Sequence, residues 1–162
     1  MKEKGSKFYY CTNKNCTPIF ESSASHPEHP NQLEKIPSNL SKEFLFTEKL
    51  GAGTAGVVFQ IFDFSEEKSK VLKIIKVDNP EEAKKELNIL HFLHHQCIIK
   101  YFRSGVLKHN KVYIVMEECD MNLEKYLEKN KAILSYDDKV NLFVNICEGI
   151  NYIHNHKKVI LC

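Results

Sequence analysis

The alternation of hydrophobic and polar residues divides this chain into three zones. Residues 1–30 are mostly polar. Residues 31–41 contain Pro37, Ser38 and Asn39 in a row, a cluster typical of loops, so we interpret this zone as a linker. From residue 42 to residue 162, apolar positions recur in regular patterns, which predicts a packed domain.

Several segments of the third zone are rich in β-branched and aromatic residues, as strands are. They cover residues 43–50, 56–64, 70–77, 96–106 and 111–119. The first two flank a glycine-rich turn, which predicts that they pair as antiparallel neighbours. The pattern therefore predicts a five-stranded antiparallel sheet.

The stretch between the third and fourth predicted strands begins with helix-start signals. Asn79 is of a residue type that caps helices, Pro80 follows at the first helical position, and Glu81 and Glu82 suit the first turn. These signals predict a helix within residues 79–95.

Beyond residue 119 the spacing of apolar residues is helical. Residues 122–129 predict a short helix, and Ser135 with Asp138 has the pattern of a capping box. A long helix then carries apolar residues at helical spacing, namely Val140, Val144, Cys147 and Ile150. The predicted fold class is therefore α+β, with a sheet and one helix followed by helices only.

The composition places few limits on function. Hydrophobic residues make up 43% of the chain, charged residues 27%, and the formal net charge is +2, so neither nucleic acid nor an anionic membrane is indicated as a partner. The start "MKEKGSKFYY" lacks the apolar core of a signal peptide, and no stretch approaches the roughly 18 apolar residues of a membrane span. We therefore expect a cytoplasmic protein whose scattered cysteines are free thiols, apart from Cys11 and Cys16, which are candidates for metal binding.

A glycine loop lies between the first two predicted strands, in "LGAGTAGVVF". Gly51, Gly53 and Gly56 alone would also suit a plain flexible turn. Dinucleotide-binding and Walker loops need a helix directly after the glycines, whereas "VVFQIFDF" favours a strand. A glycine turn between antiparallel strands is suited to covering phosphates with backbone N–H groups.

Two charged residues occupy positions that the pattern predicts to be apolar. Lys73 alternates with Val71 and Ile75 along one face of the third strand, and Glu86 lies on the helix stripe that also carries Leu87. Burial of either charge alone costs free energy that a mutual ion pair offsets, so we expect the two to meet. Alternatively, one of them extends to solvent along its aliphatic stem.

Together these features resemble the eukaryotic protein kinase family, from about Glu43 to Ile160. The resemblance is carried by "LGAGTAGVVF", "KVLKIIK", "KKELNILHFLHHQCIIKYF", "VYIVMEEC" and "NICEGINYIHNHKKVI". It implies a protein-kinase-like N-lobe, a hinge and the first helices of an incomplete helical C-lobe. It also implies serine/threonine kinase activity, the transfer of phosphate from ATP to protein hydroxyls.

The resemblance further implies roles for individual residues. Lys73, held by Glu86, would contact the α- and β-phosphates of ATP, and Met116 would be the gatekeeper beside the adenine. The implied ATP-binding residues are Leu50, Gly51, Ala52, Gly53, Gly56, Val58, Lys73, Met116, Glu117 and Cys119. The apolar members of this set would equally serve as ordinary strand core.

The sequence departs from the family pattern at several points. Val71 stands where family members usually carry alanine, and its extra bulk would press on the adenine. After "KKVI" the family continues with His-Arg-Asp and later Asp-Phe-Gly, which supply the base and Mg²⁺ ligands, whereas this sequence reads Leu161 and Cys162. We therefore expect a truncated kinase domain, inactive on its own; the alternative is a non-catalytic, pseudokinase-like module that binds nucleotide or a partner.

The first zone contains residues of the types that bind zinc. Cys11, Cys16, His26 and His29 could form a Cys₂His₂ site, and the His-x-x-His followed by proline resembles the closing half of a B-box-type zinc module. The leading half of that motif is absent. The alternative is a polar tail with incidental cysteines.

Overall fold

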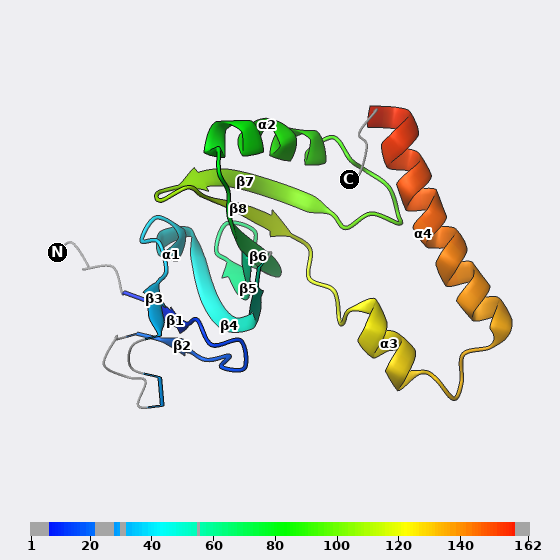
Figure 1. The fold of residues 1–162 in the computed structure, drawn as a ribbon, viewed down its shortest axis with the longest axis horizontal. Coiled ribbons are helices and arrows are strands. Elements are labelled where there is room, and N and C mark those ends of the chain that lie inside the picture. The colour runs from blue at the N-terminus through cyan, green and yellow to red at the C-terminus, as the bar shows by residue number, and fades with distance from the viewer. Residues whose placement is uncertain (1–6, 22–27, 30–31, 55, 158–162) are drawn as a thin grey trace.

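A computed structural model describes residues 7–21, 28–29, 32–54 and 56–157, without the side chains of Glu86, His156 and Lys157 (Figure 1). The described residues form two antiparallel sheets, a short helix between the sheets in the sequence, a helix that covers the larger sheet, and two further helices after that sheet. The N-terminal elements are β1 (Tyr9–Cys11), β2 (Ile19–Phe20), β3 (Leu33–Lys35) and α1 (Leu40–Glu43). The later elements are β4 (Phe44–Gly53), β5 (Gly56–Asp63), β6 (Lys68–Lys76), α2 (Pro80–Leu90), β7 (Tyr101–Leu107), β8 (Lys111–Met116), α3 (Leu123–Lys129) and α4 (Tyr136–Lys157).

The larger sheet confirms the predicted α+β fold class. It has five strands in the order β4-β5-β6-β8-β7, and every neighbouring pair is antiparallel. β4 extends further than predicted, because its last residues include Gly51 and Gly53. The glycine loop is therefore part of the β4–β5 hairpin, in which Gly53 faces Gly56.

Helix starts follow the sequence signals closely. The side chain of Asn79 accepts hydrogen bonds from the backbone N–H groups of Glu81 and Glu82, and Asn122 caps α3 in the same way. Before α4, the backbone N–H of Asp138 donates to Ser135 Oγ at 3.1 Å and the N–H of Ser135 donates to Asp138 Oδ2 at 2.9 Å. This reciprocal pair is the predicted capping box.

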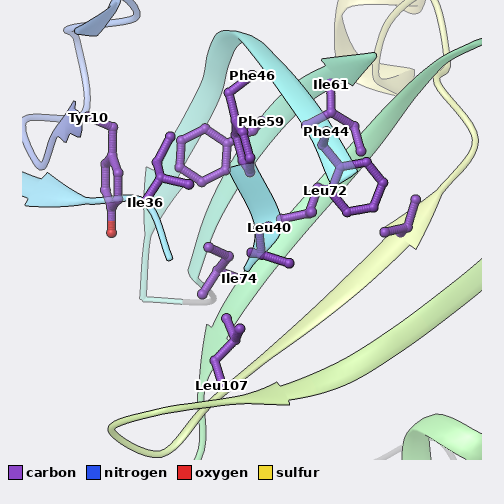
Figure 2. Close-up of a cluster of buried hydrophobic side chains, with 11 residues drawn as sticks. Tyr10, Ile36, Leu40, Phe44, Phe46, Phe59, Ile61, Leu72, Ile74 and Leu107 are labelled. Atoms are coloured by element: carbon purple, nitrogen blue, oxygen red, sulfur yellow. The ribbon is translucent and has the colours of Figure 1, made fainter. Parts of the chain in front are cut away.

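Two hydrophobic clusters lie against the larger sheet. One lies beside α2 and contains Leu87, Val112 and Ile114. Figure 2 shows the other, a group of buried residues that comprises Tyr10, Ile36, Leu40, Phe44, Phe46, Phe59, Ile61, Leu72, Ile74, Leu107 and Val115. Since Leu72 and Ile74 alternate with Lys73 and Ile75 along β6, the two clusters occupy opposite faces of the sheet.

The N-terminal elements cover the sheet face opposite α2. Ile36 and Leu40 are fully buried there, although they lie in the zone interpreted as a linker. The ring of Tyr10 packs edge-on against Phe59 at 5.0 Å between centroids. Residues 31–41 therefore contain β3, the start of α1 and part of the core.

A buried polar network lies at the end of β5. The Lys70 ammonium is 3.0 Å from the Asp63 carboxylate, and Arg103 reaches the same carboxylate at 3.3 Å. Burial by itself raises the pKa of Asp63, but hydrogen bonds from Ser65 and Lys70 outweigh it and lower the pKa to about 2. The carboxylate is therefore held in its charged form inside the protein.

The helical region contacts the segment after α2. The backbone N–H of His94 donates to the Tyr152 hydroxyl at 3.3 Å, and the rings of His95 and Tyr152 stack at 4.9 Å. Elsewhere α3 and α4 extend away from the sheet (Figure 1). In the described part of the chain, no helix has both the length and the apolar character that a bilayer crossing requires.

Candidate functional site

The glycines of the hairpin between β4 and β5 differ in whether a residue with a side chain could replace them. Gly56 has a φ of +112°, and a Cβ added there would lie 2.1 Å from the carbonyl oxygen of Ile74 on the neighbouring strand. Only glycine fits that position. A Cβ on Gly51 or Gly53 would meet no described atom within 4 Å, so protein packing does not explain these two glycines.

Lys73 lies in the middle of the sheet, on the face that α2 covers. Its neighbours across the strands are Val58 of β5 and Ile114 of β8. Ile114 packs in the cluster with Leu87 of α2, and Lys73 is itself half-buried. The structure thus brings Lys73 next to Val58, as a shared site requires.

Glu86, the expected partner of Lys73, is a residue of α2. Its side chain lies outside the described part of the structure, so the expected ion pair stays a prediction. Among the described residues, the ion pairs do not include Lys73.

The end of β8 holds the residues expected to contact adenine. Met116 pairs with Val71 across the sheet, which places the bulky valine directly beside the expected gatekeeper. The backbone N–H of Glu117 donates to the carbonyl oxygen of Lys100 at 2.9 Å, so its carbonyl oxygen is the backbone group that Glu117 can offer to a ligand. Cys119 is exposed, and Leu50 of β4 is half-exposed, at 48%.

A connection between the glycine hairpin and the hinge was not predicted from the sequence. Gln60 of β5 donates from Nε2 to Glu118 Oε1 at 2.5 Å, and Thr47 of β4 donates to Gln60 Oε1 at 2.8 Å. The one signal in the sequence was a polar residue inside the apolar run "VVFQIFDF". These bonds connect β4 and β5 to the segment that follows β8.

A second group of reactive side chains lies in the N-terminal sheet. The thiols of Cys11 and Cys16 and a ring nitrogen of His29 all lie within 4.8 Å of one another. Burial raises the pKa of the Cys16 thiol, and the neighbouring Cys11 thiol adds to this effect. His26, the fourth ligand expected from the sequence, lies outside the described residues.

Lys49 connects this group to β4 and was not identified from the sequence. Its side chain is fully buried, and its ammonium donates to the carbonyl oxygens of Cys11 at 2.7 Å and Asn13 at 2.5 Å. Burial lowers the pKa of Lys49, while the Cys11 and Cys16 thiols act in the opposite direction. The loop that carries the cysteines is thus attached to the strand that leads into the glycine hairpin.

Comparison with known proteins gives a family for most of the chain. The protein kinase domain profile matches residues 44–161, which include the larger sheet and all the helices from α2 onward. The N-terminal sheet lies outside the match.

Individual relatives agree with this family. The chain is 30% identical over 127 residues to the serine/threonine-protein kinase dst1 of Dictyostelium discoideum, which covers 76% of this chain and 17% of dst1. It is 28% identical to the STE7 homolog of Candida albicans (strain WO-1) over 164 residues, or 89% of this chain and 28% of the relative. Mouse Nek11 is 28% identical over 142 residues, or 79% and 22%. The chain thus spans less than a third of each of these proteins.

Proposed function

The chain belongs to the protein kinase family, and on this basis we propose that it is the ATP-binding portion of a serine/threonine protein kinase. The match to the kinase domain confirms the family predicted from the sequence. The serine/threonine assignment is supported by relatives that carry that description. Phosphoryl transfer belongs to the whole kinase, of which this chain represents a part.

The proposed site binds ATP between the glycine hairpin and the hinge. Backbone N–H groups around Gly51 and Gly53 cover the phosphates, and Lys73, held by Glu86, contacts the α- and β-phosphates. The proposed adenine contacts are Leu50, Val58 and Met116, with backbone groups of Glu117 and Cys119, and Ala52 completes the site within the glycine loop. The observation that carries this proposal is the position of Lys73, beside Val58 of the glycine hairpin and on the face covered by α2.

Nucleotide binding can be tested by thermal unfolding of the chain with and without ATP. We expect ATP to raise the melting temperature of the wild type, because a ligand that binds only the folded state stabilises it. Lys73→Ala should lose this shift. Lys76→Ala is the matched control, because Lys76 is an exposed lysine at the end of the same strand. An equal shift in both variants, or none in the wild type, would contradict the proposed site.

Catalysis requires groups that this chain does not supply at the family's positions. The sequence has Leu161 and Cys162 after "KKVI", where the family has the His-Arg-Asp of its catalytic loop. In the family, side chains of the catalytic loop and of the later Asp-Phe-Gly motif hold Mg²⁺ and accept the proton of the substrate hydroxyl. We propose that this chain is inactive alone, and that residues 42–162 form the kinase part of a cytoplasmic protein.

The alternative is a non-catalytic module that binds nucleotide or a partner kinase. The buried Val71 beside Met116 favours weak nucleotide binding, because its bulk occupies the adenine side of the site. Incubation with radiolabelled ATP, Mg²⁺ and a general protein substrate separates the two functions. If the chain, extended by further C-terminal sequence, transfers phosphate to the substrate, the kinase function is favoured. If the extended chain binds ATP without transferring phosphate, the non-catalytic module is favoured.

A further inference from the structure

We propose that Cys11, Cys16 and His29 form a zinc site that fixes the N-terminal sheet to strand β4. This proposal does not depend on the nucleotide site, because these residues precede the part of the chain that matches the kinase domain. It rests on the positions of the three side chains and on the contacts that hold their loop.

The three ligand groups suit zinc in chemistry and in spacing. Two thiols and one imidazole are soft or borderline donors, which favour Zn²⁺ over Mg²⁺ or Ca²⁺. Ligand atoms about 2.0–2.3 Å from a tetrahedral zinc lie roughly 3.5–3.8 Å apart. The three atoms here already lie within 4.8 Å of one another, so small side-chain rotations suffice to bring them around one ion.

The loop between β1 and β2 is held so that both cysteines face His29. Cys11 is buried as the last residue of β1, and the N–H of Cys16 donates to the carbonyl oxygen of Asn13 at 3.1 Å. The side chain of Asn13 lies 3.2 Å from Nε2 of His29, which orients the ring.

Contacts with β4 give the site a structural role. The ammonium of Lys49 donates to the carbonyl oxygens of Cys11 and Asn13, and the N–H of Lys49 donates to the carbonyl oxygen of Thr17 at 2.9 Å. Lys49 lies two residues before Gly51. A metal that fixes the cysteine loop therefore stabilises the strand that leads into the glycine hairpin.

The test uses the full chain, purified with reductant and freed of metal. Zinc titration against a chromophoric chelator should give one tightly bound ion per chain. Cys16→Ser and His29→Ala should weaken binding by more than the roughly 10- to 100-fold that loss of an outer-shell partner costs. The matched controls Cys147→Ser and His154→Ala change exposed residues of α4 and should retain the wild-type affinity.

Two further measurements on the wild type test the zinc site even if a ligand variant fails to fold. Cobalt added to the wild type should give a thiolate-to-cobalt charge-transfer band and the strong visible bands of tetrahedral coordination. Removal of zinc should lower the melting temperature of the whole chain in a single transition, because Tyr10 shares its core with Phe59.

Specific results would overturn the zinc site. One is equal zinc affinity in Cys16→Ser and Cys147→Ser. Another is a weak, octahedral cobalt spectrum without a thiolate band. A third is a Cys11–Cys16 disulfide in the freshly purified chain that takes up zinc neither before nor after reduction.

Discussion

The five-stranded sheet and the helical region formed by α3 and α4 bury their apolar residues very differently. The sheet is covered on both faces, by α2 on one side and by the N-terminal elements on the other, and its central side chains are almost fully buried. α3, α4 and the loop between them instead line an open, largely apolar groove with Leu123, Leu127, Leu134, Leu142, Phe143 and Ile146. Phe59 of the sheet is 0% exposed, whereas Phe143 of α4 is 66% exposed.

This difference indicates where the chain obtains its stability. Free energy from apolar burial is proportional to the area removed from water, so most of it comes from the sheet and its two covers. The helical region depends more on its own hydrogen bonds, such as the capping box at Ser135. Mutations of the same chemical type should therefore have unequal effects in the two regions.

The largest expected effect comes from truncating a buried phenylalanine. Phe59→Ala should lower the free energy of unfolding by about 3–5 kcal/mol, because it leaves a cavity among Tyr10 and Phe46. Phe143→Ala should change it by no more than about 0.5 kcal/mol, since that ring is mostly exposed. Urea unfolding followed by circular dichroism measures both values. Equal destabilisation by the two variants would contradict the contrast between the regions.

A glycine in the hairpin should give the next largest effect. Gly56→Ala should destabilise the chain by about 3 kcal/mol, because the new methyl group would collide with the Ile74 carbonyl at a positive φ. Gly53→Ala is the matched control and should cost less than about 1 kcal/mol, since its Cβ would meet no described atom. Thermal unfolding compares the two, and a larger loss in Gly53→Ala would show that the hairpin has another conformation.

Acid should weaken the sheet through Asp63. Its pKa falls from an ordinary value of 3.8 to about 2 in the folded chain, so its ionised form contributes stability above pH 4 that is lost as the pH falls toward 2. The contribution is on the order of 2 kcal/mol. In Asp63→Asn this part of the acid sensitivity should disappear, while Asp120→Asn, an exposed control, should retain it. Urea midpoints between pH 6 and pH 2 provide the measurement, and parallel curves for Asp63→Asn and the wild type would contradict it.

The sequence predicted best those features that depend on neighbouring residues. Asn79 and Ser135 mark helix starts through hydrogen bonds to residues two or three positions away, and the strands of the larger sheet follow local runs of β-branched residues. The role of residues 31–41 was missed because Ile36 and Leu40 are buried by Phe44 and Phe59, which come later in the chain. Between these two residues lie Pro37, Ser38 and Asn39, which are typical of a loop, so the sequence did not indicate that Ile36 and Leu40 are buried.

The residues of the candidate sites also differ in whether local sequence patterns could predict their positions. Lys73 could be placed from strand alternation, because every second residue of β6 shares its face. Lys49 could not, since its burial arises from carbonyl groups of the N-terminal loop, more than thirty residues away. The bond between Gln60 and Glu118 also joins segments far apart in the sequence, 58 residues from one another. Partners of this kind require the tertiary structure.

The smallest expected effect on stability concerns the exposed apolar groove of the helical region. It also tests most directly the contrast between this region and the sheet. Because a continuous apolar groove binds other apolar surfaces, we expect this chain to bind a hydrophobic dye and to self-associate as its concentration rises. Phe143→Gln should reduce both while changing the unfolding free energy by no more than about 0.5 kcal/mol. Phe64→Gln is the control, since Phe64 is 53% exposed but lies beside the sheet, outside the groove. Light scattering and dye fluorescence would contradict the expectation if the wild type stayed monodisperse and bound no dye. Dye binding that fell equally in both variants would contradict the assignment of the dye-binding surface to the groove.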